Sequence, residues 1–236
     1  MLDTLRTEVL EANLELVRRG LVLYTFGNAS AVSRAEGLIA IKPSGVPYEE
    51  LKPADIVIAD MEGRVVEGKL RPSSDLPTHA ALYRAFPQIG GVAHTHSRHA
   101  TAWAQACREI PCFGTTHADY CEGPIPVTAH LSTEEIESAY ELNTGVAIIR
   151  RMEGLEPLAY PGILVAGHAP FCWGETVSKA AHNAVVLEEL AAMAWQTLTI
   201  NPQAQPLPGS LHHKHHSRKH GPKAYYGQTS LGEKAS

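Results

Sequence analysis

Apolar residues at helical spacing, together with capping and stop signals, predict five helices. In the first, Leu5, Val9, Ala12 and Leu16 recur every three or four residues, and Gly20 follows as a stop. An amphipathic stripe of this kind normally packs on a core. The predicted helices comprise residues 3–19, 77–86, 98–107, 132–143 and 178–200.

Short apolar runs between turn residues predict the strands. The strands comprise residues 21–26, 38–41, 56–59, 65–66, 90–97, 146–149 and 163–166, with loops expected at 114–120 and 155–161. The third and fourth strands are expected to pair across the turn at 60–63. Antiparallel strands that follow one another favour a meander over a doubly wound sheet. The pattern therefore predicts one α/β domain with a mainly antiparallel sheet.

The C-terminal stretch 201–236 differs from the rest of the chain. It is rich in Pro, His, Lys and Gly, a composition that is typical of a flexible tail. Residues 223–227 are unusually aromatic for such a tail. We expect them either to pack on their own subunit or to reach a neighbouring one.

The composition is that of an ordinary globular protein. The 236 residues are 44% hydrophobic and 19% charged, which suits one domain with a substantial core. A net charge of -5 gives no general attraction to nucleic acid or to an anionic membrane, and no apolar run is long enough to span a bilayer. The four cysteines show no paired spacing and no signal-like run opens the chain, so we expect free thiols and a cytoplasmic protein.

Two histidines at the end of a predicted strand are the first candidates for chemistry. His94 and His96 follow an apolar run, and alternation along a strand points both side chains to one face. They can share a metal ion, or they can be an ordinary strand end that donates to carbonyls. His168 also follows an apolar run, and Asp75 adds a carboxylate. Three imidazoles and a carboxylate make a plausible catalytic zinc set, in which manganese or cobalt could replace zinc.

Three polar loops have the chemistry to bind phosphate. Hydroxyls, an amide, backbone N–H groups and a lysine suit a phosphate dianion, although such clusters are more often plain turns. The loops contain Gly27 with Asn28, Lys42 with Ser44 and Gly45, and Ser73 with Ser74 at a helix start.

A metal beside a phosphate site suits an aldol reaction, because the ion stabilises the oxyanion that forms as a carbon–carbon bond breaks. Asp119 as an anionic base and Tyr226 as a phenolic acid are candidates for moving the protons. Each also has a plainer explanation. Asp119 can be a loop carboxylate that accepts backbone N–H groups, and Tyr226 a buried aromatic residue with a tethered hydroxyl.

Six ordered blocks of the sequence resemble the L-ribulose-5-phosphate 4-epimerase family of the class II aldolase/adducin-head superfamily. The resemblance extends from about Leu2 to Gln228, and the blocks keep nearly unchanged spacing. The blocks are residues 27–30, 41–46, 72–79, 94–101, 114–120 and 218–228.

The resemblance implies a three-layer α/β/α fold with a central, mainly antiparallel sheet, and a ring-shaped homotetramer whose active sites lie between subunits. Residues 1–228 would form the domain, with 201–228 completing the active site and 229–236 flexible. The implied zinc ligands are Asp75, His94, His96 and His168. Asp119 and Tyr226 are the implied acid/base pair, with Tyr226 supplied by the adjacent subunit. The implied substrate-binding residues are Gly27, Asn28, Lys42, Ser44, Gly45, Ser73, Ser74, Thr115, Thr116, His215 and Arg218.

The implied reaction interconverts L-ribulose 5-phosphate and D-xylulose 5-phosphate at carbon 4. The hydrogen on that carbon is not next to the carbonyl, so the bond between carbons 3 and 4 must break and re-form on the other face. One alternative is a class II aldolase that releases its products; such relatives usually carry glutamate where this chain has Asp75. Another is a non-catalytic module like the adducin head, which would be expected to lack the histidines. A role in arabinose or in ascorbate breakdown fits the sequence equally.

Overall fold

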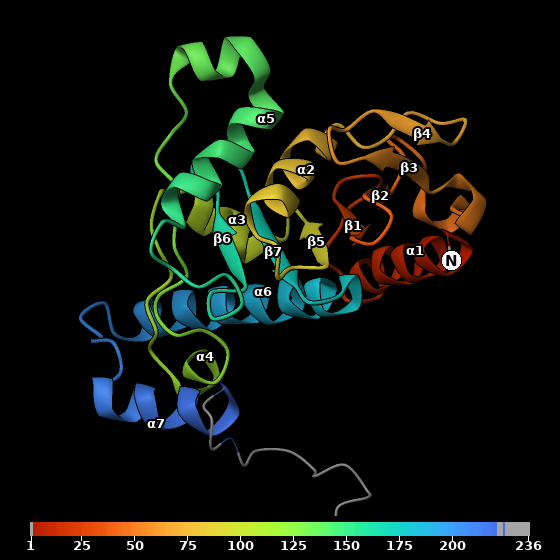
Figure 1. The fold of residues 1–236 in the computed structure, drawn as a ribbon. Coiled ribbons are helices and arrows are strands. Elements are labelled where there is room, and N and C mark those ends of the chain that lie inside the picture. The colour runs from red at the N-terminus through yellow and green to blue at the C-terminus, as the bar shows by residue number, and fades with distance from the viewer. Residues whose placement is uncertain (1, 221–223, 225–236) are drawn as a thin grey trace, which may run out of the picture.

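An antiparallel sheet forms the centre of the protein (Figure 1). The structure is a computed structural model and describes residues 2–220 and 224. In that part of the chain the sheet has seven strands in the order β4-β3-β2-β1-β5-β7-β6, and each neighbouring pair is antiparallel. The strands are β1 (Asn28–Ser33), β2 (Leu38–Ile41), β3 (Val57–Asp60), β4 (Val65–Glu67), β5 (Gly91–His94), β6 (Gly162–Leu164) and β7 (Pro170–Gly174).

Helices cover both faces of this sheet. One face shares a core with α1, α3 and α6, and the other shares a core with α2 and α5. A further pair, α4 and α7, pack together on the side of α6 that faces away from the sheet (Figure 1). The predicted three-layer α/β/α fold is therefore confirmed. The helices are α1 (Leu2–Arg18), α2 (Leu76–Ala85), α3 (Arg98–Gln105), α4 (Thr115–Ala118), α5 (Thr133–Arg151), α6 (Val177–Ile200) and α7 (Gly209–His220), with the 3-10 turns η1 (Tyr48–Glu50) and η2 (Pro53–Asp55).

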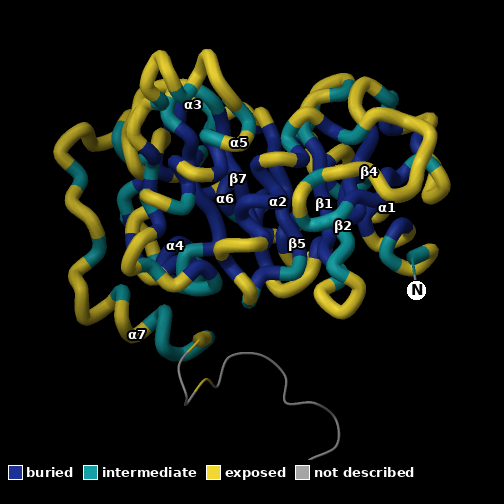
Figure 2. The backbone as a smooth tube through the Cα atoms, turned by 45° about the horizontal axis from the view of Figure 1, so that its top comes forward, coloured by how far each residue is buried: buried dark blue, intermediate teal, exposed yellow. Residues whose placement is uncertain are grey.

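The two faces of the central strands carry side chains of different size. Ala40 and Ala93 lie in the core beneath α1 and α6, whereas their neighbours Ile41 and Val92 lie in the core beneath α2. Figure 2 shows these strands among the buried parts of the chain. Small residues on one face allow the helices there to approach closely. None of the helices in the described residues combines the length and the apolar character that crossing a membrane requires.

Most of the predicted elements are confirmed to within a few residues. The helices expected at 3–19, 77–86, 98–107 and 178–200 correspond to α1, α2, α3 and α6, and the predicted hairpin corresponds to β3 and β4. The strands at 38–41 and 163–166 correspond to β2 and β6, and residues 155–161 form the expected loop.

Three predictions of local structure are wrong. Residues 21–26 form a turn rather than a strand, and the strand begins at Asn28. Residues 146–149 belong to α5, which continues the helix expected at 132–143 past a kink at Ala139. A short apolar run fits a buried helix face as well as a strand, and here Ile148 packs in the core with α2. The expected loop at 114–120 contains the single turn of α4.

Two elements have no counterpart in the sequence prediction. β7 follows β6 after a short connection, and the sequence pattern predicts no separate strand there. α7 has no buried residues, and therefore lacks the apolar stripe that reveals a helix. The predicted strand at 90–97 is also shorter than expected, because β5 ends at His94.

We predict that the contact between β5 and α6 tolerates no side chain at Gly91. A Cβ there would lie 2.3 Å from the Cα of Val177 and 2.4 Å from its backbone nitrogen. Gly91→Ala should therefore destabilise the fold by about 3 kcal/mol, because backbone atoms must separate. Thermal or denaturant unfolding measures the change. Gly114→Ala is the matched control, since a Cβ at Gly114 meets nothing within 4 Å; equal stabilities would contradict the prediction.

Candidate active site

His94 is fixed in place by the sheet. As the last residue of β5, it pairs with Asn28 of β1 and with Phe171 of β7. Its ring stacks on the ring of Phe171, with centroids 4.1 Å apart, and its Nδ1 lies 2.9 Å from the carbonyl oxygen of Pro170. A carbonyl only accepts, so Nδ1 donates its proton and Nε2 is left with a lone pair. This is the tautomer of a metal ligand whose outer nitrogen is oriented by the backbone.

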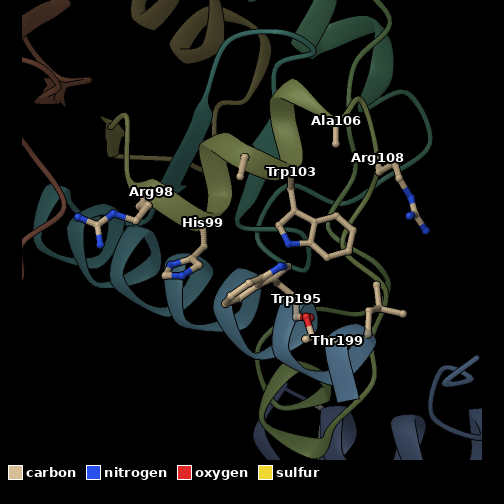
Figure 3. Close-up of a pocket in the computed structure, with 9 residues that line it drawn as sticks. Arg98, His99, Trp103, Ala106, Arg108, Trp195 and Thr199 are labelled. Atoms are coloured by element: carbon tan, nitrogen blue, oxygen red, sulfur yellow. The ribbon is translucent and has the colours of Figure 1, made fainter. Parts of the chain in front are cut away.

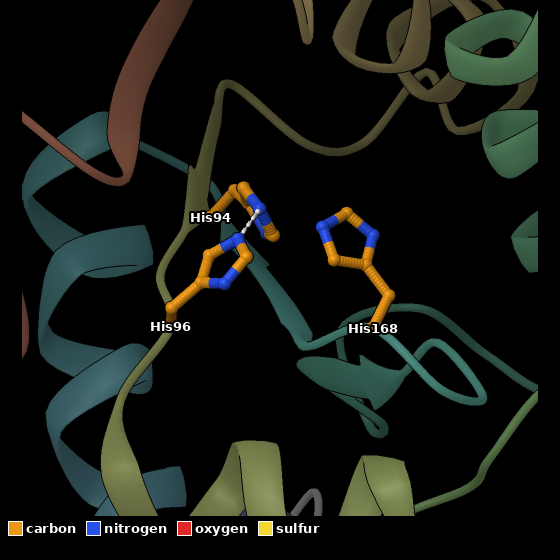
Figure 4. Close-up of side chains that lie close together, drawn as sticks. All are labelled: His94, His96 and His168. Atoms are coloured by element: carbon orange, nitrogen blue, oxygen red, sulfur yellow. Dashed lines mark hydrogen bonds between the residues drawn. The ribbon is translucent and has the colours of Figure 1, made fainter.

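Two further histidines converge on that lone pair (Figure 4). The ligand nitrogens of His94, His96 and His168 all lie within 4.8 Å of one another, and the Nε2 atoms of His94 and His96 are 3.1 Å apart. His96 follows β5, and His168 lies in the turn between β6 and β7. Within the described residues, no other group of three such ligands converges in this way. The structure thus brings together three of the four predicted ligands.

The surroundings of two of these imidazoles favour the neutral form. Burial lowers the pKa of His168 to about 4, and the neighbouring His94 and His96 act in the same direction. Partial desolvation lowers the pKa of His96 as well, and His94 adds to that shift. Only a neutral imidazole binds a metal, so His96 and His168 are held in the state that a divalent cation requires.

Asp75, the fourth predicted ligand, lies beside the triad but outside the group of converging nitrogens. It occupies the N-cap position of α2, yet its side chain makes no capping hydrogen bond. Its carboxylate instead accepts from the amide nitrogen of Asn28 at 2.7 Å. Burial raises the pKa of this carboxyl, but His94, His79 and the Asn28 hydrogen bond outweigh burial and hold it below its usual range. Asp75 is therefore an ionised group next to the three imidazoles.

The three predicted phosphate loops are linked to one another. The Asn28 amide donates to Ser73 Oγ at 3.0 Å, and the backbone N–H of Ser73 donates to the carbonyl of Lys42 at 3.0 Å. The hydroxyl of Tyr48 donates to the carbonyl of Gly27 at 2.8 Å. The loops are thus a single surface next to Asp75, on which Ser44, Gly45 and Ser74 are exposed.

Lys42 does not extend from this surface into solvent. The residue is 1% exposed, and its ammonium group donates to the carbonyl of Val46 at 3.0 Å and lies 4.5 Å from the ring centroid of Tyr48. Burial lowers the pKa of Lys42 to about 8. In the described arrangement this lysine holds the 42–46 loop in shape, a role that residue spacing does not reveal.

Two buried or half-buried residues near the triad were not predicted. Tyr140 of α5 places its hydroxyl 3.4 Å from Nδ1 of His168. His79 of α2 binds Ser30 Oγ through Nδ1 at 2.7 Å, and burial lowers its pKa to about 3. Neither residue carries a local sequence signal, because each reaches the site only through the packing of its helix on the sheet.

The remaining predicted residues gather around α4 and α7. The Asp119 carboxylate accepts two hydrogen bonds from Arg218, at 3.0 and 2.5 Å, and lies 3.0 Å from Nδ1 of His215. Burial raises the pKa of Asp119, but the hydrogen bonds from Arg218 and His215 outweigh it and lower the pKa below the usual value. Thr115 and Thr116 form the first turn of α4. Tyr226 lies outside the described residues.

The candidate site residues therefore form two groups within one chain. The triad and the polar loops lie at the sheet, whereas Asp119, His215 and Arg218 join α4 to α7 beyond α6 (Figure 1). Each group is internally connected by hydrogen bonds. The structure shows no contact between them within the described residues of this chain.

Comparison with known proteins identifies the family of the chain. Residues 7–195 match the family model described as class II aldolase and adducin N-terminal domain. The chain belongs to this family. A curated relative from Salmonella paratyphi B (strain ATCC BAA-1250 / SPB7), named L-ribulose-5-phosphate 4-epimerase UlaF, is 56% identical over 227 residues, which cover 96% of this chain and 100% of the relative. The resemblance drawn from the six sequence blocks is thus confirmed.

Solved structures of this class II aldolase family share the fold. An L-fuculose 1-phosphate aldolase superposes with a TM-score of 0.77 and 24% identity, covering 91% of this chain and 95% of that one. YgbL from Klebsiella pneumoniae, described as a putative aldolase/epimerase/decarboxylase, superposes with a TM-score of 0.72 and 24% identity. The match covers 91% of this chain and 98% of that one. At these identities the likeness establishes the fold alone.

We predict that Arg218 is the main link between α7 and α4. Arg218→Ala removes both of its hydrogen bonds to Asp119, and hydrogen bonds to charged groups contribute roughly 1.5–3 kcal/mol where solvent is excluded. Amide hydrogen exchange in residues 209–220 should become about tenfold faster, as a loss near 1.4 kcal/mol implies. His213→Ala, at an exposed position of the same helix, should leave exchange unchanged. Slow exchange in Arg218→Ala would show that other contacts hold α7.

Proposed function

We propose that this chain is a metal-dependent L-ribulose-5-phosphate 4-epimerase, with zinc as its metal. The observation that carries the proposal is the triad of converging histidines next to a polar surface suited to phosphate, in a chain 56% identical to a protein of that name. The epimerase relative matches along its whole length, so the C-terminal segment is included in the likeness.

The donor set fits a divalent cation. The Nε2 atoms of His94 and His96 lie 3.1 Å apart, and the lone pair on His94 Nε2 can accept a proton from His96 or bind a cation in its place. His94, His96 and His168 would hold the ion, and the ionised Asp75 beside them is the proposed fourth ligand. A bound zinc ion would supply a Lewis acid that polarises the substrate carbonyl.

The polar loops are proposed to hold the substrate by its phosphate. Ser44, Gly45 and Ser74 are exposed there, and Ser74 lies just before the N-terminus of α2, which favours an anion. Gly27, Asn28 and Ser73 belong to the same linked surface. Because the bond between carbons 3 and 4 must break, the anchored phosphate would keep the glycolaldehyde phosphate fragment in the site. Its aldehyde group can then rotate and present its other face. Re-addition of the three-carbon fragment to the other face then completes the inversion.

Asp119 and Tyr226 are proposed as the acid and base on the two faces of the substrate. The lowered pKa of Asp119 keeps it ionised, as a base requires. Its group lies beyond α6 from the triad, so we propose that a second copy of the chain brings it to the metal centre. This supports the expected homotetramer, with Thr115, Thr116, His215 and Arg218 lining the shared site. We further propose that the enzyme acts in the cytoplasm on a product of pentose or ascorbate breakdown.

The first test is to load the purified protein with zinc, add L-ribulose 5-phosphate and follow D-xylulose 5-phosphate by NMR. Conversion without free glycolaldehyde phosphate is expected. His96→Ala should lose both bound zinc and conversion, because it removes one of three convergent ligands. His182→Asn, an exposed histidine of α6, should keep both. Accumulation of free aldehyde would identify an aldolase instead.

Tyr226→Phe separates proton transfer from metal binding. Removing one hydroxyl should lower turnover by about 100-fold or more, the range expected for a lost general acid or base, while the zinc content stays intact. The neighbouring Tyr225→Phe is the matched control and should turn over normally. Unchanged turnover in Tyr226→Phe would remove this residue from the mechanism.

A further inference from the structure

Helix α3 begins directly after the metal-binding segment but does not cap its own N-terminus. Ser97 is the N-cap residue, one position beyond His96, and its side chain makes no capping hydrogen bond. A helix N-terminus has backbone N–H groups without a partner inside the helix, and serine at the N-cap normally satisfies one of them. In α3 that role falls to a residue far away in the sequence.

Glu188 of α6 supplies the missing cap. Its Oε1 accepts the backbone N–H of His99 at 2.9 Å, and its Oε2 accepts that of Ala100 at 2.9 Å. These are the second and third residues of α3, the same groups that a local capping side chain would bind. The negative charge also lies at the positive end of the helix dipole.

The Glu188 carboxylate is buried at this position. Glu188 is only 9% exposed, and it also binds the His99 ring at 2.8 Å. Burial raises the pKa of Glu188, but the hydrogen bonds from Ala100 and His99 outweigh it and lower the pKa below the usual value. Figure 3 shows His99 at the start of α3, lying against α6 beside Trp195, at the edge of a cavity of about 520 Å³ between the two helices.

This cap matters because His96 lies outside the sheet that fixes His94. His94 is held by strand pairing, by Pro170 and by Phe171. His96 lies in the irregular segment 95–97 and is exposed, and its ring lies near those of Phe26, His94 and His168. The path of its backbone is set by the end of β5 on one side and the start of α3 on the other.

We propose that Glu188 is a positioning residue for the metal centre, which holds His96 in its ligand position by anchoring the start of α3 to α6. The inference rests on the proposed metal site. In this role Glu188 contacts neither the metal nor the substrate. Loss of outer groups that orient metal ligands typically costs about 10- to 100-fold in metal affinity.

The test compares zinc affinity, measured by competition with a chelator, in the full-length wild-type protein and in E188Q. Glutamine keeps the size of the side chain, but one carboxylate oxygen becomes an NH2 group that faces a backbone N–H. Zinc affinity should fall about tenfold in E188Q. E189Q, the exposed neighbour on α6, should bind zinc as the wild type does. His99→Ala should also stay close to the wild type, because its backbone N–H still reaches Glu188.

A spectroscopic readout distinguishes positioning from general destabilisation. Cobalt-loaded E188Q should show visible absorption bands shifted from those of the wild type, because His96 is displaced, whereas lost stability alone would leave the spectrum of the folded protein unchanged. Equal zinc affinity and equal spectra in E188Q and the wild type would overturn the inference. A wild-type protein that binds no zinc would instead contradict the proposed metal site.

Discussion

The candidate active site depends on the register of three strands at the centre of the sheet. Antiparallel pairing places Asn28, His94 and Phe171 side by side, so their side chains project from the same face. A slip of one residue would turn His94 into the alanine-lined core beneath α6 and leave Asn28 away from Asp75. The alternation of small and large residues along β2 and β5 opposes that slip, because it would move Ile41 and Val92 into the places of Ala40 and Ala93 beneath α6.

Around this row of paired strand residues, the irregular segments of the site are bound by charged residues, one of them distant in sequence. Lys42 shapes the loop that contains Ser44 and Gly45, and Glu188 caps the helix that follows His96. Both groups are charged and buried, which costs free energy unless hydrogen bonds compensate. Each is bound to backbone atoms of one loop or helix start. The free energy of burying these charges is thus offset by contacts that restrict how the site segments can move.

The sequence revealed the parts of the protein whose signal is local. Helical periodicity located α1 and α6, and the blocks around His94 and Asp75 identified the family. Local signals failed where tertiary contacts determine the secondary structure. Residues 146–149 are helical and pack on α2. Helix α7 has no apolar stripe and is bound to the α4 segment through polar contacts. The sequence did not predict the roles of Tyr140 and Glu188 for the same reason. No neighbouring residue shows that Tyr140 reaches His168 or that Glu188 reaches α3. The proposed roles of Asp75, Asp119 and Tyr226 remain predictions.

The division of the site residues into two groups constrains how the proposed reaction can work. One chain carries the histidine triad at the sheet and the Asp119 group beyond α6. Bringing them together inside one chain would require α4 and α7 to move around α6, at the cost of contacts such as the hydrogen bond from the Tyr120 hydroxyl to the Asn183 carbonyl. Association of a second copy requires no such rearrangement, because each chain can offer its Asp119 group to a neighbour's triad. In a closed symmetric assembly, whether a two-fold dimer or a ring, every chain both gives and receives that group, and the proposed homotetramer is one such assembly.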